Sequence, residues 1–166
     1  MKQYILKDNK LTLKVKKSSL YIRLIMFFFS FLFFLLPLMA IFSAIAMGNR
    51  FHIGFLFGLF FFGLLGFYLL RVALWNTYGK EELIFAKNQI TYLADYGWFR
   101  DSIKIRERIS QTYSVKSIGY KNENKGVLVI GKDDKKIECV TVMPTNEIKE
   151  LIITIEKHSK EPEQQS

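Results

Sequence analysis

The sequence predicts a membrane-anchored protein of mixed class, in which a hairpin of two transmembrane α-helices is joined to a small α+β domain. Three observations lead to this prediction. Of the 16 phenylalanines, 14 lie between Phe27 and Phe67, so apolar side chains are concentrated as in a bilayer-embedded segment. Arg50 is the one charged residue between Leu24 and Leu70. After this block, short alternating segments separated by turn residues are typical of antiparallel strands.

The apolar block divides into two predicted spans. Residues 24–47 carry no charge, and at about 1.5 Å per residue a helix of this length crosses a hydrocarbon core of about 30 Å with some tilt. Residues 53–74 form the second predicted span, and the short segment between the two allows only a tight turn. Ala44-Ile-Ala46 resembles a signal-peptide cleavage site, but the apolar segment is too long for a signal peptide and a second span follows at once. We therefore expect both spans to be retained.

Basic residues at the two ends of this hairpin predict its orientation. Residues 1–23 contain seven Lys or Arg and one Asp, whereas the connecting turn contains only Arg50. Because basic residues remain on the cytoplasmic side, we expect both termini in the cytoplasm. Residues 71–166 carry 16 basic and 14 acidic side chains. The net charge of +9 is thus explained by topology and does not indicate nucleic-acid binding.

Small residues recur at helical spacing near the predicted turn. Such residues allow two helix backbones to approach closely within a membrane. The pattern predicts contact between the two helices of the hairpin, and the alternative is contact with another subunit. The residues concerned are Ala40, Ala44, Gly48, Gly54 and Gly58.

The cytoplasmic domain is predicted over residues 76–158, as an antiparallel sheet that curls or closes into a barrel and is capped by one C-terminal helix. The helix is predicted to begin at a cap on Thr145 or Asn146. Its apolar residues follow the i, i+3, i+4, i+7 rule of an amphipathic helix, namely Ile148, Leu151, Ile152 and Ile155. Residues 159–166 offer nothing to bury and are expected to be disordered. The strands are predicted near residues 82–85, 90–93, 100–110, 113–118, 127–130 and 137–142.

The N-terminal segment, residues 1–18, also contains strand-like alternation, most clearly at Leu11-Thr-Leu-Lys-Val-Lys16. An isolated hairpin of this size is marginally stable in water. Since this segment and the C-terminal domain are expected in one compartment, we predict that its strands pair with the sheet of the domain.

The order of these elements resembles that of uncharacterised bacterial membrane proteins that carry a pleckstrin-homology-like (PH-like) domain. The resemblance rests on the basic N-terminal strand, the two spans, the strand–turn–strand segment Gly79-Lys-Glu-Glu-Leu-Ile-Phe-Ala-Lys-Asn-Gln-Ile-Thr-Tyr92, and the strand–turn–strand–helix ending of residues 126–157. It implies a PH-like fold and anchoring in a bacterial inner membrane. It implies no catalytic residues.

The sequence contains no recognisable catalytic or metal-binding pattern. There are two histidines, His52 and His158, and a single cysteine, Cys139. Neither a phosphate-binding loop of the G-x-x-x-x-G-K-[ST] type nor a G-x-S-x-G nucleophile elbow is present. We therefore predict a protein that is not an enzyme and needs no cofactor or metal.

One group of cations suggests a binding surface. Lys104, Arg106 and Arg108 alternate in a predicted strand and would share one face, with Arg100 nearby. Such a face would attract anionic lipid headgroups, with about 1 kcal/mol per cation. The alternative is a solvated strand face whose charges prevent pairing with other chains.

Together these features predict an interaction module that docks a protein partner at the cytoplasmic face of the membrane. Two alternatives remain open. The first is a sensor or binder of anionic lipid headgroups that acts in envelope homeostasis. The second is an accessory subunit of a transporter or envelope complex. The expected partners are membrane lipids and a membrane-associated protein.

Overall fold

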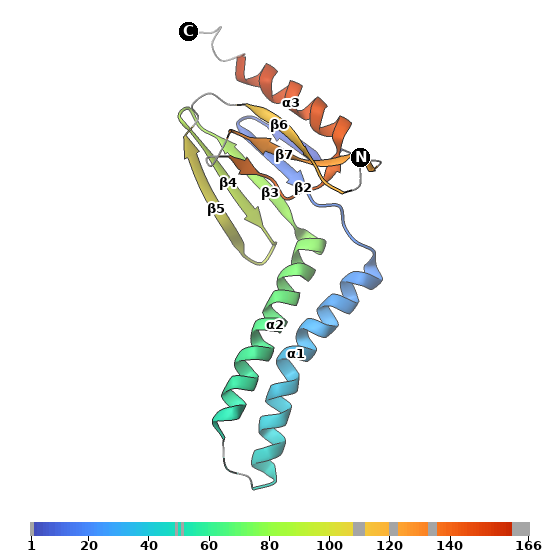
Figure 1. Cartoon of the computed structure of the whole chain (residues 1–166), viewed down its shortest axis with the longest axis vertical. Coiled ribbons are helices and arrows are strands. Elements are labelled where there is room, and N and C mark those ends of the chain that lie inside the picture. The colour runs from blue at the N-terminus through green and yellow to red at the C-terminus, as the bar shows by residue number, and fades with distance from the viewer. Residues whose placement is uncertain are drawn as a thin grey trace. The chain divides into compact units, whose positions relative to one another are not determined.

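The computed structural model describes residues 2–48, 50, 52–107, 112–119, 123–132 and 136–160, with residues 158–160 described by their backbone. The chain divides into two compact units. The helical unit comprises residues 17–77, and the sheet unit comprises residues 1–16 together with residues 78–166. Figure 1 shows the elements of both units.

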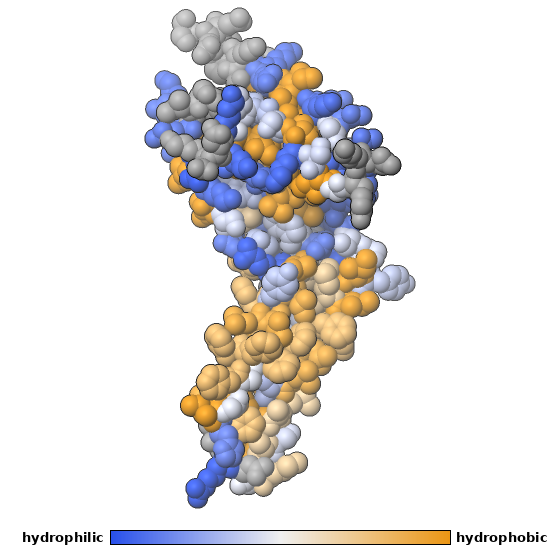
Figure 2. All heavy atoms as spheres, viewed as in Figure 1, coloured by the Kyte–Doolittle hydropathy of each residue, from blue (hydrophilic) through white to orange (hydrophobic). Residues whose placement is uncertain are grey.

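The helical unit consists of two long helices, α1 (Leu20–Ala46) and α2 (Ile53–Tyr78). The last residue of α2, Tyr78, is counted with the sheet unit. Both are long and apolar enough to span a membrane, and most of their large apolar side chains are exposed. Figure 2 shows this apolar surface in orange along the helices. The spans predicted at residues 24–47 and 53–74 fall on these helices, and Pro37 lies inside α1.

The two helices contact each other at Gly66. The hydroxyl of the buried Ser30 on α1 donates a hydrogen bond to the carbonyl oxygen of Gly66 on α2 at 2.9 Å. A Cβ added at Gly66 would lie 3.0 Å from the ring of Phe34. Absence of a side chain at this position therefore permits the approach of the two backbones.

The small residues singled out in the sequence lie elsewhere. A Cβ added at Gly48, Gly54 or Gly58 would meet no atom within 4 Å. Ala40 is exposed and Ala44 is half-buried. Among the glycines compared, the close contact within the hairpin is therefore made at Gly66, whereas the predicted Gly48, Gly54 and Gly58 have no neighbour close enough to meet an added side chain.

The sheet unit contains a five-stranded antiparallel sheet with its strands in sequence order. The strands are β1 (Tyr4–Lys7), β2 (Lys10–Lys14), β3 (Lys80–Phe85), β4 (Gln89–Asp95) and β5 (Arg100–Glu107). The N-terminal hairpin of β1 and β2 belongs to this sheet because β2 pairs with β3, with Leu13 opposite Glu81. The helices α1 and α2 are thus inserted between two neighbouring strands of one sheet.

A second sheet and the C-terminal helix complete the unit. Strand β7 (Lys125–Ile130) pairs with β6 (Tyr113–Ser117), β8 (Ile137–Glu138) and β9 (Met143–Pro144). Helix α3 (Thr145–Lys160) packs on β6, β7 and β9. Of the apolar series that the helical periodicity predicts, Ile148, Leu151 and Ile155 are buried and Ile152 is half-buried.

The α+β class, the antiparallel pairing and the C-terminal helix are confirmed. The described residues form two sheets and no closed barrel. The strand predicted at residues 137–142 is interrupted, because β8 ends at Glu138 and β9 begins at Met143. Helix α3 extends through Lys160, two residues beyond the predicted end of the domain, and residues 161–166 lie outside the described part of the chain.

Candidate interaction surface

Strand β5 lies at one edge of the five-stranded sheet. Among the described residues it pairs only with β4, so its second row of backbone groups faces away from the sheet. Its pairing shifts register between Tyr92 and Ala94 of β4. At this bulge two residues of β5, Ser102 and Ile103, face one residue of β4, and Ser102 has a positive φ of 58°. An extra residue of this kind bends the strand and reverses the alternation of its side chains.

The bulge determines which side chains of β5 share a face. Lys104 is opposite Tyr92, and Arg106 is opposite Ile90. Because Tyr92 and Ile90 are buried, the two cations lie on the inner face of the sheet, beyond the edge of its core. The ammonium of Lys104 is 5.6 Å from the centre of the Tyr92 ring, which is within the range of a cation–π interaction.

Two isoleucines project from the opposite face of β5. Ile103 is 64% exposed and Ile105 is 56% exposed. The apolar residues of this strand therefore lie outside the core, and its cations lie on the side of the core. This is the reverse of the usual arrangement, in which the apolar side chains of a strand face the core. Because the strand is at the edge, it extends past the residues that cover the core, and both of its faces remain accessible.

The predicted cationic residues do not form one surface. Lys104 and Arg106 share the inner face, as the alternation predicts. Arg100 precedes the bulge and lies on the outer face, where its Nε is 3.5 Å from Oδ2 of Asp95. Arg108 lies outside the described residues.

The outer face of the sheet carries a row of ion pairs that the sequence analysis did not single out. The ammonium of Lys10 is 2.8 Å from the Glu82 carboxylate, and that of Lys80 is 3.2 Å from Glu82 and 3.3 Å from Asp95. Burial raises the pKa of Glu82, but hydrogen bonds from Lys10 and Lys80 outweigh it and hold the pKa below its ordinary value. Asp95 behaves in the same way: burial opposes its charged form, and the amide of Gly97 together with Lys80 lowers its pKa.

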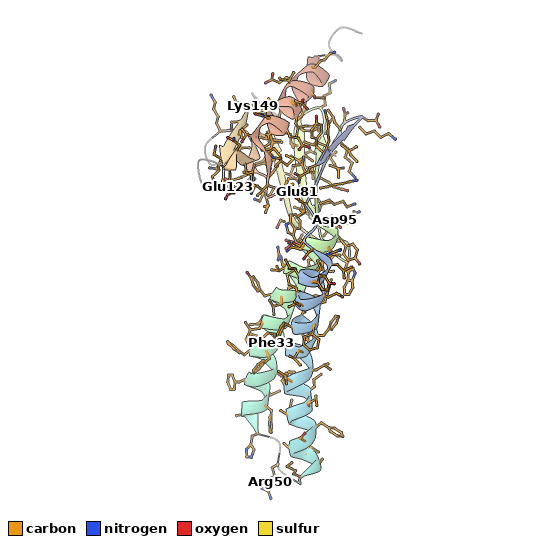
Figure 3. The ribbon with its side chains drawn as sticks, turned by 90° about the vertical axis from the view of Figure 1, so that its right-hand side faces the viewer. Phe33, Arg50, Glu81, Asp95, Glu123 and Lys149 are labelled. Carbon is orange, nitrogen blue, oxygen red and sulfur yellow. The ribbon has the colours of Figure 1, made fainter. Side chains whose placement is uncertain are left out.

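A buried carboxylate, Glu81, occupies the inner face of β3 (Figure 3). Its Oε1 accepts hydrogen bonds from the hydroxyl of Tyr92 at 2.5 Å and from the N–H of Val140 at 2.7 Å. Its Oε2 accepts the N–H of Thr141 at 2.7 Å. A buried carboxylate is costly unless such donors replace its water. We call this arrangement the Glu81 clasp.

The Glu81 clasp explains why the strand predicted at residues 137–142 is interrupted. The N–H groups of Val140 and Thr141 bond to the carboxylate instead of to a neighbouring strand. The sequence did contain a signal for this residue. Glu81 precedes Leu83 and Phe85 by two and four positions, so it stands in phase with the apolar residues of an alternating strand.

The remaining reactive groups near the clasp are protected. Burial, followed by the nearby Glu81 carboxylate, raises the pKa of the Tyr92 phenol. Burial likewise raises the pKa of the Cys139 thiol, so this thiol remains protonated and poorly nucleophilic at neutral pH. Within the described part of the chain, no group of three or more His, Cys, Asp or Glu side chains is placed to hold a metal ion.

Comparison of the chain with protein-family models, with curated proteins and with solved structures gives no match in any of the three. The functional conclusion therefore rests on the geometry of the chain itself.

Proposed function

We propose that the chain is a membrane-anchored, non-enzymatic interaction module that docks a protein partner at the cytoplasmic face of a bacterial inner membrane. In this proposal α1 and α2 span the bilayer, and both termini are cytoplasmic. The proposal is supported by two long apolar helices and by seven basic residues before α1's apolar core, against the single Arg50 in the turn. The strands followed by one C-terminal amphipathic helix support a PH-like assignment of the sheet unit.

The docking site in this proposal is strand β5, which would accept an extended segment of the partner as an additional strand. The observation that carries it is the exposure of Ile103 and Ile105 on an edge strand of eight residues. Edge strands are normally protected by charge, by bulges or by a covering element. Strand β5 carries cations and a bulge, but its two isoleucines, each more than half exposed on one face, do not protect the edge against pairing with another chain. An added strand would satisfy the open backbone groups and cover these side chains.

The test uses the full-length tagged protein, extracted gently from its native membrane, with the mass and composition of the particle determined. We expect a stoichiometric second protein that is lost from the Ile105→Lys variant. Ile5→Lys is the matched control, because Ile5 is 49% exposed on β1, the other edge strand of the same sheet. A particle that contains only this chain and lipid would overturn the proposal. Phospholipid whose retention depends on Lys104 and Arg106 would then favour headgroup recognition.

A further inference from the structure

The end of β2 that leads along the chain to α1 and the end of β3 that follows α2 lie at the same end of the five-stranded sheet. Lys14 of β2 is opposite Lys80 of β3, Lys80 is opposite Asp95 of β4, and Asp95 is opposite Arg100 of β5. After Lys14 the chain continues toward α1, and Lys80 follows the end of α2 by two residues. The turn between β4 and β5, residues 96–99, extends beyond this same row.

This turn is held in place by three sets of contacts. The rings of Tyr96 and Phe99 stack with their centres 4.8 Å apart and their planes at 13°. The amide of Gly97 donates to Oδ1 of Asp95 at 2.7 Å. Gly97 also lies directly against Tyr78, since a Cβ added there would be 2.8 Å from the Tyr78 Cβ. With φ at 88°, Gly97 adopts a conformation that other residues rarely take.

The tip of the turn is Trp98, which is 64% exposed. The rings of Tyr96 and Phe99 stack on each other, and Gly97, directly before Trp98, lies against Tyr78, the last residue of α2. A large apolar ring is thus presented on a well-anchored turn. Single exposed apolar residues are common on protein surfaces, so the contact of the adjoining Gly97 with Tyr78, where the chain leaves α2, is what distinguishes Trp98.

The length of α2 indicates where a membrane surface would lie. A hydrocarbon core of about 30 Å takes roughly 20 helical residues, which from Ile53 brings the chain to about Val72. A headgroup layer of about 5–7 Å takes three to five more residues, roughly to Trp75 or Thr77. Tyr78, and the turn that Gly97 holds against it, therefore fall at the outer margin of the headgroup layer.

We propose that Trp98 inserts its indole into the headgroup layer, so that the β4–β5 turn is a second, peripheral membrane anchor. Tryptophan favours this layer because its ring is apolar and its N–H is polar. The adjoining row carries three cations, Lys14, Lys80 and Arg100, against the carboxylates of Asp95 and Glu82, and this excess of positive charge favours an anionic membrane surface. This inference rests on the proposed anchoring by α1 and α2.

The two tryptophans of the chain allow an internal control. Trp75→Phe leaves Trp98 as the sole tryptophan, and Trp98→Phe leaves Trp75, which lies in α2. Each full-length variant is reconstituted in vesicles of phosphatidylglycerol and phosphatidylcholine, with lipids brominated at known depths. Each is accepted as folded when the buried Cys139 is not labelled by maleimide before denaturation.

We expect the emission of Trp98 to be blue-shifted, quenched by shallow bromines and protected from aqueous iodide. Emission of Trp98 at the wavelength of free tryptophan, with full quenching by iodide, would overturn the inference. If Trp75 is quenched by brominated lipid in that case, the anchoring by the helices stands and only the peripheral anchor fails. If neither tryptophan is quenched by brominated lipid, the proposed membrane anchoring fails as well.

Discussion

The Glu81 clasp gives the sharpest prediction about stability. In Glu81→Gln, an amide nitrogen replaces one of the two carboxylate oxygens, which together accept three hydrogen bonds. Whichever way the amide turns, at least one donor loses its acceptor: the buried N–H of Thr141 in one orientation, and the part-buried N–H of Val140 in the other. An unsatisfied buried donor costs about 1–3 kcal/mol, and hydrogen bonds to a charged acceptor lose roughly half their strength when the charge is removed. We expect a loss of about 2–4 kcal/mol in the free energy that keeps residues 139–142 closed.

The assay is hydrogen exchange with mass spectrometry on the full chain in nanodiscs. A loss of about 2–4 kcal/mol corresponds to exchange roughly 30- to 1,000-fold faster in the segment 139–142. Two controls accompany it. Tyr92→Phe removes one donor but leaves both amide bonds to Glu81, so it should accelerate exchange there far less. Glu82→Gln removes the same charge from the opposite face of β3 and should leave this segment protected.

An unchanged exchange rate in Glu81→Gln would refute the reasoning. It would mean that the amides of Val140 and Thr141 do not depend on the carboxylate, and that the interruption between β8 and β9 has another cause. Equal acceleration in Glu81→Gln and Glu82→Gln would indicate a general loss of stability of the sheet unit and would refute the local role as well.

Three further predictions follow from the same structure. The thiol of Cys139, buried and with a raised pKa, should resist iodoacetamide at pH 8 and react only after denaturation; prompt labelling of the native chain would contradict this. The pKa of Glu82 is lowered in the folded chain. The contribution of its charge to stability is therefore complete above the unfolded pKa of about 4.3 and is lost as the pH falls through the folded value. In urea titrations between pH 6 and 3, the free energy of unfolding should fall less steeply with falling pH in Glu82→Gln than in the wild type. Gly66→Ala, whose added Cβ would lie 3.0 Å from Phe34, should lower the melting temperature of the detergent-solubilised chain, whereas Gly58→Ala, with no atom within 4 Å, should not; equal effects would show that the helices do not meet at Gly66.

The amino-acid sequence by itself determined the features of this protein that depend on local composition and periodicity. The two long helices follow from apolar content, because a helix satisfies the backbone groups of a long uncharged run within the run itself. Helix α3 and its buried residues, such as Leu151, follow from the 3.6-residue period. Strand alternation likewise indicated most of the antiparallel strands.

The tertiary structure alone decided the features that depend on partners distant in the sequence. The bulge at Ser102 adds one residue to β5, and because side chains alternate with period two, this single residue moves Arg100 to the face opposite Lys104. The Glu81 clasp joins residues about 60 positions apart in the sequence. Val140 and Thr141 lie in a segment with strand propensity, but their amides bond to this carboxylate instead of to a neighbouring strand. Local propensity is worth at most about 1 kcal/mol per residue, and hydrogen bonds to a buried charge outweigh it at about 1.5–3 kcal/mol each.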